Sequence, residues 1–211
     1  MSIRAYLGGS FDPIHKGHMQ MAELVQQALS CAKQAGEIDE YHVSLLPTKG
    51  NPFKDKQTPI TERLAMLTLA LQDSDIGIDA TELSLPAPNY TIDTVRLLTT
   101  TYPDERLILI MGLDSLVALL TWKSGLDILN FVHLWVFLRA GSGQIPDELL
   151  PYISHQAADL FTQKTGVIYM DDTPILDISS TTIRQKIAHG EANLPLAEAV
   201  ADYITAHQLY V

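Results

Sequence analysis

The chain has 211 residues, of which 46% are hydrophobic and 18% charged, and its formal net charge is −11. This length suits one α/β domain spanning residues 1–211, and the acidic balance argues against nucleic acid or an anionic membrane as a partner. A single cysteine, Cys31, excludes intrachain disulfides, and we expect it to be buried. The apolar zone 107–122 is broken by polar residues and is too short to span a bilayer, so we expect a cytoplasmic protein.

The first element pattern is a strand, a polar loop and a helix. Residues 3–7 are apolar and predict a buried strand, and residues 19–35 carry apolar positions at helical spacing. Between them runs Gly8-Gly9-Ser10-Phe11-Asp12-Pro13-Ile14-His15-Lys16-Gly17-His18. Two adjacent glycines let a ligand approach the backbone, and the N–H groups at the helix start favour phosphate.

Two histidines in this loop carry the candidate chemistry. His15 and His18 are three residues apart, so both rings can face one side of the first helical turn and donate to phosphoryl oxygens. A tight turn with two surface histidines is the plainer alternative. A transition-metal pair is a third interpretation, but no nearby Cys or His supplies further ligands.

The middle of the chain alternates strand and helix patterns. Residues 34–40 predict a helix extension and a loop, 41–46 a second strand, and 76–85 a third. The loop 48–59 holds three lysines in an acidic chain. It is either a solvated loop or a lid at the strand end that brings Lys54 to a phosphate.

Two further helix starts follow. Tyr90 and Thr91 open a helix whose first N–H groups can hold a carboxylate, although Asn89 or Thr91 can equally be a simple cap. Residues 105–111 predict a central buried strand that ends at Gly112, and Asp114 beyond it can accept from ribose hydroxyls or cap a helix. Trp122 is either a core residue or a stacking partner for a flat ring.

The last part of the chain ends in helices. Residues 134–138 and 167–170 predict strands. A helix then opens within Ile178-Ser179-Ser180-Thr181-Thr182-Ile183-Arg184, where the hydroxyl residues suit capping. Arg184 lies one turn further and can reach a polyphosphate. Strand and helix alternate throughout, which predicts a mainly parallel sheet covered by helices on both faces.

Two of these segments resemble a known family. The segment 8–18 is similar to the GG[T/S]FDPxHxGH signature of nucleotidylyltransferases, specifically the bacterial nicotinate mononucleotide adenylyltransferases, and the segment 178–184 is similar to their ISSTxIR motif. The resemblance extends to Glu82-Leu83, to the segment 89–94, and to Met111-Gly112-Leu113-Asp114-Ser115-Leu116 with Trp122. It thus covers most of the chain in the family's order.

The resemblance implies a Rossmann-like nucleotidyltransferase fold with a small helical C-terminal part at about 178–211. It implies adenylyl transfer from ATP to nicotinate mononucleotide, giving nicotinate adenine dinucleotide and pyrophosphate, with Mg²⁺ carried by ATP. The catalytic residues would be His18, His15 and Arg184. The ATP-binding residues would be Gly8, Gly9, Ser10, Phe11, His15, His18, Gly112, Asp114, Ile178, Ser179, Ser180, Thr181 and Arg184. The acceptor would contact Lys54, Tyr90, Thr91, Asp114 and Trp122.

Departures from the family pattern leave alternatives open. Ser10 stands where threonine is commonest, and Pro86-Ala87-Pro88 stands where relatives often carry a basic residue. The acceptor could instead be nicotinamide mononucleotide or phosphopantetheine, or the chain could be an ATP-sensing module without turnover. A homo-oligomer is compatible with the sequence, which sets no oligomeric state.

Overall fold

A computed structural model of the chain describes residues 1–50, 57–138 and 143–211, so the predicted acceptor contact Lys54 lies outside the described residues. Its strands are β1 (Ser2–Gly9), β2 (Glu40–Pro47), β3 (Gly77–Ile78), β4 (Glu105–Gly112), β5 (His133–Phe137), β6 (Ile153–Ser154) and β7 (Ile168–Asp171). Its α-helices are α1 (Lys16–Gln34), α2 (Ile60–Ala70), α3 (Thr91–Thr101), α4 (Leu113–Ala118), α5 (Asp159–Thr162), α6 (Ser180–Ala188) and α7 (Glu198–Ala206). Short 3₁₀ helices are η1 (Thr81–Ser84), η2 (Leu119–Thr121), η3 (Leu126–Asn130) and η4 (Asp147–Tyr152).

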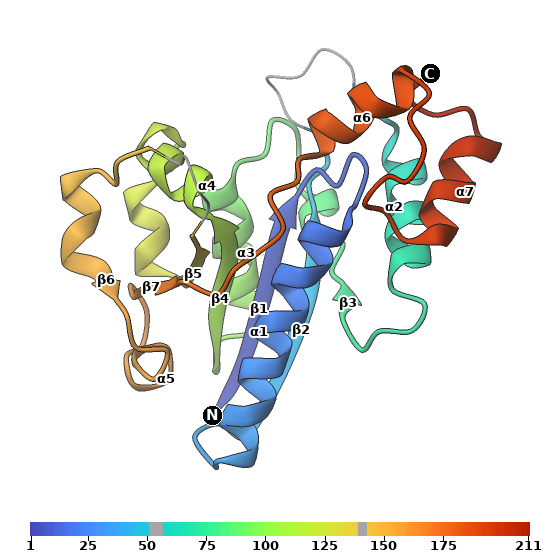
Figure 1. Cartoon of the computed structure of the whole chain (residues 1–211). Coiled ribbons are helices and arrows are strands. Elements are labelled where there is room, and N and C mark those ends of the chain that lie inside the picture. The colour runs from blue at the N-terminus through green and yellow to red at the C-terminus, as the bar shows by residue number, and fades with distance from the viewer. Residues whose placement is uncertain (51–56, 139–142) are drawn as a thin grey trace.

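The strands form one parallel sheet in the order β3-β2-β1-β4-β5-β7-β6 (Figure 1). The chain runs from β1 outward to β2 and β3, then returns to the other side of β1 as β4. The direction of winding therefore reverses between β1 and β4. Ligands of open α/β sheets bind at such a reversal, at the carboxyl ends of the strands. This confirms the parallel sheet that the alternating pattern predicts and the Rossmann-like fold that the family resemblance implies.

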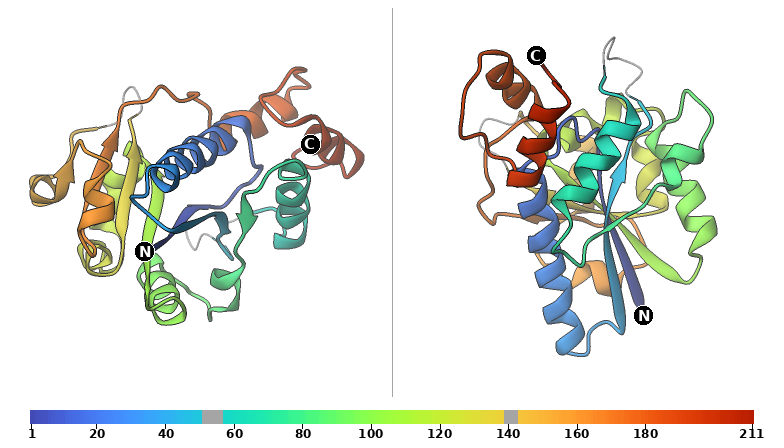
Figure 2. Two further views of the ribbon diagram at one scale, coloured as in Figure 1. Left: turned by 90° about the horizontal axis from the view of Figure 1, so that it is seen from below. Right: turned by 90° about the vertical axis from the view of Figure 1, so that its right-hand side faces the viewer.

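Helices cover both faces of the sheet, with α1 on one face and α3 on the other (Figures 1 and 2). The buried residues separate accordingly into two clusters. One contains Val25 and Leu29 of α1 with Met66 of α2 and Val200 of α7. The other is built around α3, through Ile92, Val95 and Leu98, together with residues of α4 and η3. Strands β4 and β5 are buried along most of their length, as expected for central strands between two layers.

Several local predictions are wrong, for identifiable reasons. The predicted strand at 76–85 is only the two residues of β3, because the chain turns into η1 directly afterwards. The predicted extension at 34–40 is not helical: α1 ends at Gln34, and Gly36 adopts a positive φ of 76° in the turn that follows. Cys31 is exposed rather than buried, since it lies off the stripe of α1 that carries Val25, Leu29 and Ala32.

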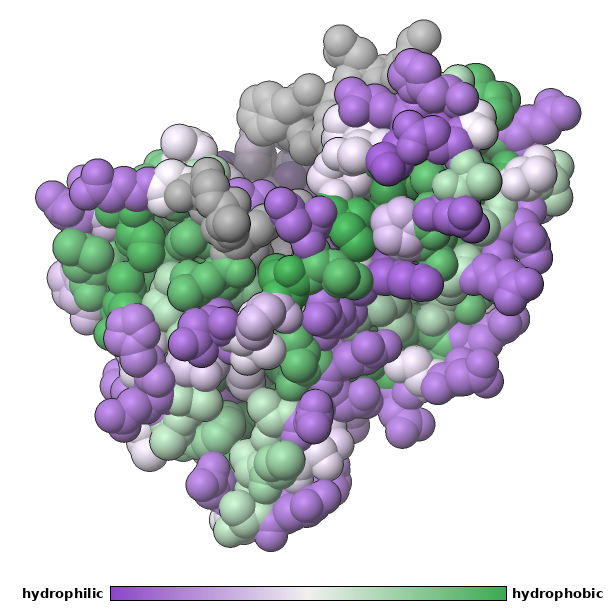
Figure 3. Space-filling model, in the orientation of Figure 1, coloured by the Kyte–Doolittle hydropathy of each residue, from purple (hydrophilic) through white to green (hydrophobic). Residues whose placement is uncertain are grey.

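The surface is mixed in character. Hydrophilic residues predominate along the right-hand edge of the face seen in Figure 3, and hydrophobic ones are scattered in small groups over the rest. Scattered apolar residues of this kind are normal on a folded surface. Within the described ranges, no helix is long and apolar enough to cross a bilayer.

Candidate active site

The glycine loop begins where two neighbouring strands stop pairing. Strand β1 pairs with β4 only as far as Leu7, opposite Ile110, but continues beside β2 through Gly9, opposite Pro47. The two strands therefore separate at their carboxyl ends, at the reversal point of the sheet, where open α/β sheets bind their ligands. Gly8 lies at this point, exposed, and a Cβ added there would meet nothing within 4 Å.

The loop is compact because of Phe11. Its side chain is 1% exposed, and its backbone adopts a φ of 46°, a left-handed conformation that is uncommon outside glycine. The ring packs so closely under the loop that a Cβ at Gly9 would lie 3.1 Å from it. Gly9 is thus required by the packing of Phe11, whereas Gly8 leaves space for a ligand. The positive φ belongs to Phe11 and to neither glycine, which the sequence did not predict.

The two histidines lie together at the start of α1. His15 is the N-cap residue, buried to 5% exposure, and its Nδ1 accepts from the backbone N–H of His18 at 3.3 Å. The imidazoles stack with centroids 3.6 Å apart and an interplanar angle of 18°. The ring of Phe11 contacts the ring of His18 edge-on, with 5.0 Å between the two ring centroids. Since Nδ1 of His15 accepts, the neutral ring carries its proton on Nε2 and donates from there. The predicted juxtaposition of the pair is therefore present.

The C-terminal motif joins the same loop. Ser179 caps α6, its Oγ accepting from the N–H of Thr182 at 3.1 Å, so the helix begins two residues later than the motif. Ser180 Oγ donates to the carbonyl of Pro13 at 2.9 Å. Arg184 donates from Nη1 to the carbonyl of Asp12 at 2.7 Å and from Nη2 to Thr181 Oγ1 at 3.2 Å. Residues that are far apart in the sequence thus form one group, and two of the N–H donors of Arg184 help to hold it together.

A second group of predicted residues surrounds the start of α3. Tyr90 is the N-cap residue but makes no side-chain capping bond. The ammonium of Lys123, next to the half-buried Trp122, lies 4.4 Å from the centre of the Tyr90 ring and 3.7 Å from Asp93 Oδ2. Such cation–π contacts hold an aromatic ring in a defined orientation. Trp122 also packs against the core cluster on the α3 side of the sheet. This agrees with the first of the two roles considered for it, that of a core residue.

Glu82 organises the approach to α3, a role that the sequence did not single out. Its carboxylate is buried and accepts from Asn89 Nδ2 at 2.9 Å and from Thr94 Oγ1 at 3.1 Å. Asn89 is therefore not the helix cap, because its side chain is used by Glu82. Burial raises the pKa of Glu82, and the two hydrogen bonds act in the opposite direction. The signal in the sequence was the resemblance of Glu82-Leu83 to the family pattern.

Asp114 lies in the first turn of α4, directly after β4. It is exposed, and the helix begins at Leu113 with Gly112 as N-cap, so Asp114 is not itself the capping residue. A Cβ at Gly112 would lie 2.6 Å from Asp114 Oδ1. Glycine thus leaves room for the carboxylate to fold back over the end of β4.

Arg63 of α2 connects the glycine loop to the loop that follows β2 through hydrogen bonds. Its side chain is 1% exposed although arginine is usually a surface residue. Its guanidinium donates to four backbone carbonyls at 2.7–3.1 Å, those of Thr58, Ser10, Thr48 and Lys49. Thr48 in turn donates its N–H to the carbonyl of Gly9 at 3.0 Å. Burial lowers the pKa of Arg63, yet arginine stays charged in proteins.

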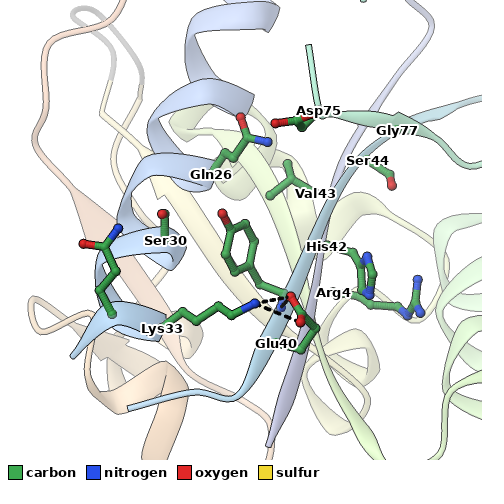
Figure 4. Close-up of a pocket in the computed structure, with 12 residues that line it drawn as sticks. Arg4, Gln26, Ser30, Lys33, Glu40, His42, Val43, Ser44, Asp75 and Gly77 are labelled. Atoms are coloured by element: carbon green, nitrogen blue, oxygen red, sulfur yellow. Dashed lines mark hydrogen bonds and ion pairs between the residues drawn. The ribbon is translucent and has the colours of Figure 1, made fainter. Parts of the chain in front are cut away.

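A hollow of about 700 Å³ lies elsewhere, beside the first half of β2 (Figure 4). Its lining includes Arg4, Lys33, Glu40 and His42, and Lys33 donates to both carboxylate oxygens of Glu40 at 2.8 Å. None of the predicted site residues lines it. We assign the active site to the strand ends instead, because the loops with the phosphate-binding chemistry meet there. Within residues 1–50, 57–138 and 143–211, no group of three or more His, Cys, Asp or Glu could hold a metal ion.

Comparison with known proteins identifies the family of the chain. The model of the cytidylyltransferase-like family matches residues 6–186. A relative from Idiomarina loihiensis, described as a probable nicotinate-nucleotide adenylyltransferase, is 36% identical, and the match covers 99% of this chain and 100% of the relative. A relative from Aeromonas hydrophila with the same description is 33% identical over 97% of this chain and 95% of its own length.

Solved structures show the same fold. The nicotinic acid mononucleotide adenylyltransferase of Plasmodium falciparum, in complex with NaAD, superposes with a TM-score of 0.71 at 18% identity, covering 99% of this chain and 97% of that one. The chain therefore belongs to the cytidylyltransferase-like family, and within it to the nicotinate-nucleotide adenylyltransferases.

Proposed function

We propose that the protein transfers the adenylyl group of ATP to nicotinate mononucleotide, giving nicotinate adenine dinucleotide and pyrophosphate in NAD biosynthesis. One observation supports this most strongly. The glycine loop that carries the stacked pair His15 and His18 also accepts hydrogen bonds from Ser180 and Arg184 of α6, at the end of β1 where its pairing with β4 stops. Helix N-termini, imidazoles and a guanidinium together suit a triphosphate.

The reaction needs positioning and charge stabilisation more than a base. The phosphate of the mononucleotide is already an anion at neutral pH; it attacks the α-phosphorus of ATP, and pyrophosphate leaves with the bonding electron pair. His18 would donate to an oxygen of the α-phosphate, where negative charge builds up in the transition state. His15 and Arg184, with the N–H groups at the start of α6, would hold the β- and γ-phosphates.

The start of α3 would select the acceptor. Because Tyr90 makes no side-chain capping bond and Asp93 N–H donates to the Tyr90 carbonyl, the N–H groups of Thr91 and Ile92 are the ones that a ligand carboxylate would use. A carboxylate also gains from the helix dipole, which a neutral carboxamide does not. We therefore favour nicotinate over nicotinamide mononucleotide, with Tyr90 and Trp122 beside the ring, Asp114 at a ribose, and Lys54 at a phosphate.

Magnesium would arrive as Mg-ATP. The acidic residue within the glycine loop, Asp12, already accepts one hydrogen bond at each carboxylate oxygen, so the carboxylate has partners within the protein. Mg²⁺ is commonly held by substrate phosphates and water with few protein ligands, and it neutralises phosphate charge when bound. The small anionic substrates and the net charge of −11 support a cytoplasmic enzyme that does not bind nucleic acid.

The test is an acceptor comparison. Purified protein is incubated with Mg-ATP and, separately, nicotinate mononucleotide, nicotinamide mononucleotide or phosphopantetheine, and pyrophosphate release is followed. We expect turnover with the nicotinate compound at least about tenfold above the nicotinamide one, since a charge-assisted hydrogen bond contributes about 1.4 kcal/mol or more. Turnover of phosphopantetheine alone would overturn the acceptor, and ATP binding without any turnover would indicate a sensor.

A further inference from the structure

Asp12 is a buried residue of the glycine loop with hydrogen bonds to several elements, and the proposed chemistry gives it no task. It is 3% exposed. Its Oδ1 accepts from the hydroxyl of Tyr210 at 2.7 Å, and its Oδ2 accepts from the N–H of Thr58 at 3.4 Å. Its backbone carbonyl accepts from Arg184 Nη1 at 2.7 Å. Asp12 thus joins the loop to the start of α2, to α6 and to the end of the chain.

Tyr210 reaches Asp12 from the other end of the sequence. It is half-buried at the edge of the core cluster that contains α1, α2 and α7, and its backbone has a φ of 66°. A left-handed conformation is unfavourable for an aromatic residue, so contacts elsewhere must hold it. Burial raises the pKa of Tyr210, which keeps the hydroxyl protonated as a donor at any physiological pH.

The two bonds to the carboxylate fix its plane. A buried carboxylate that loses one donor is left with an unsatisfied oxygen, and it rotates or draws in water to recover a partner. A shift of this carboxylate would act on the Asp12 main chain, whose carbonyl accepts from Arg184, and the residues that follow lead to His15. A change at Tyr210 would therefore reach both phosphate-binding groups although Tyr210 touches neither histidine in the hydrogen bonds described.

We propose that Tyr210 is a positioning residue, which acts through Asp12 to hold Arg184 and the glycine loop in the geometry that binds the ATP triphosphate. This inference rests on the proposed ATP site. In this proposal, the segment after α7 contributes to ATP binding, because Tyr210 connects it to the glycine loop through a hydrogen bond.

The same segment offers a matched control. Tyr203 of α7 also donates its hydroxyl to a carboxylate, Glu62 Oε2 of α2, at 2.9 Å. This bond docks α7 on α2 without reaching the glycine loop. Tyr203→Phe and Tyr210→Phe each remove one hydroxyl and keep the ring, so they differ in which carboxylate loses its donor.

The experiment measures binding and turnover separately. The dissociation constant of a non-hydrolysable ATP analogue is obtained by calorimetry without acceptor, and kcat and KM are obtained for both substrates. For Tyr210→Phe we expect the analogue to bind about tenfold more weakly, with a matching rise in KM for ATP, since a hydrogen bond to a charged group is lost. The KM for nicotinate mononucleotide should change less than about twofold, as should every constant of Tyr203→Phe.

A double-variant comparison tests the route through Asp12. If Tyr210 acts only through that carboxylate, Asp12→Ala/Tyr210→Phe should bind the analogue no more weakly than Asp12→Ala alone, because alanine removes the oxygen that accepts from Tyr210. Additive losses would overturn the route. Equal weakening in Tyr203→Phe and Tyr210→Phe, or wild-type binding in Tyr210→Phe, would overturn the positioning role itself. Because the analogue is measured without acceptor, a wild-type protein that binds it but does not use nicotinate mononucleotide would contradict the proposed function and leave this test intact.

Discussion

At the scale of single residues, His15 and His18 look equivalent in the sequence but differ in the structure. His15 is buried and its Nδ1 caps α1, whereas His18 is partly exposed and contributes its backbone N–H to that cap. The two imidazole rings are stacked, with their centroids 3.6 Å apart. His15 therefore serves the helix as well as the proposed triphosphate site, and the two functions can be separated by substitution.

We predict that His15→Ala lowers both stability and activity, because it removes the cap and an imidazole donor. The free energy of unfolding should fall by about 1 kcal/mol and kcat by about 10²-fold. In His15→Asn the amide oxygen restores the cap, so urea unfolding should return close to the wild-type value while activity stays low. His18→Ala should lower kcat by about 10²- to 10³-fold with a smaller loss of stability. Wild-type activity in His15→Asn would contradict a role for the imidazole.

At the scale of elements, the docking of α6 on the glycine loop matters most. The two serines at its start have different tasks: Ser179 caps the helix, and Ser180 bonds across to Pro13. Capping stabilises the helix itself, whereas the second bond fixes where the helix lies relative to the loop.

We accordingly predict different consequences for the two serines. Ser179→Ala should cost about 1 kcal/mol of stability, measured by urea unfolding, because one N–H at the helix start loses its acceptor. Ser180→Ala should raise KM for ATP by roughly three- to tenfold while its unfolding changes little, since a single neutral hydrogen bond is lost. The reverse pattern, with weak ATP use in Ser179→Ala and normal use in Ser180→Ala, would mean that capping alone positions α6.

At the scale of the whole molecule, stability should depend on pH through His133 of β5. The ring is fully buried, and its Nδ1 accepts from the N–H of Val167 at 3.2 Å. Burial, followed by the charge of Arg106, lowers the pKa of His133 to about 4, against 6.5 in the unfolded chain. The unfolded state therefore binds more protons between these values, so stability is fully present above pH 6.5 and falls as the pH drops toward 4.

The expected size of this effect is roughly 2 to 3 kcal/mol between pH 7 and pH 4. It is measured as the difference in unfolding free energy between wild type and His133→Asn across that range. Asparagine keeps an acceptor for Val167 but does not titrate, so its curve should be flatter by this amount. Parallel curves for the two proteins would show that His133 does not titrate on unfolding.

The sequence predicted the parallel fold and the main loops because buried strands and amphipathic helices each have a characteristic spacing of apolar residues. It placed β1, α1, β4 and α6 within a few residues, and the pairing of His15 with His18 followed from their spacing alone. It did not predict Arg63, Glu82 or Tyr210, since each acts through hydrogen bonds to residues brought near only by the fold. The bond from Tyr210 to Asp12 spans 198 positions, which no local pattern records.

The central claim is that the triphosphate binds between the glycine loop and the start of α6. The most direct test is a crystal structure of the protein with a non-hydrolysable ATP analogue. We predict phosphate oxygens within hydrogen-bonding distance of His18 and Arg184, and a triphosphate lying over Gly8. An analogue bound instead in the hollow beside Lys33 and Glu40, with both histidines untouched, would contradict the account.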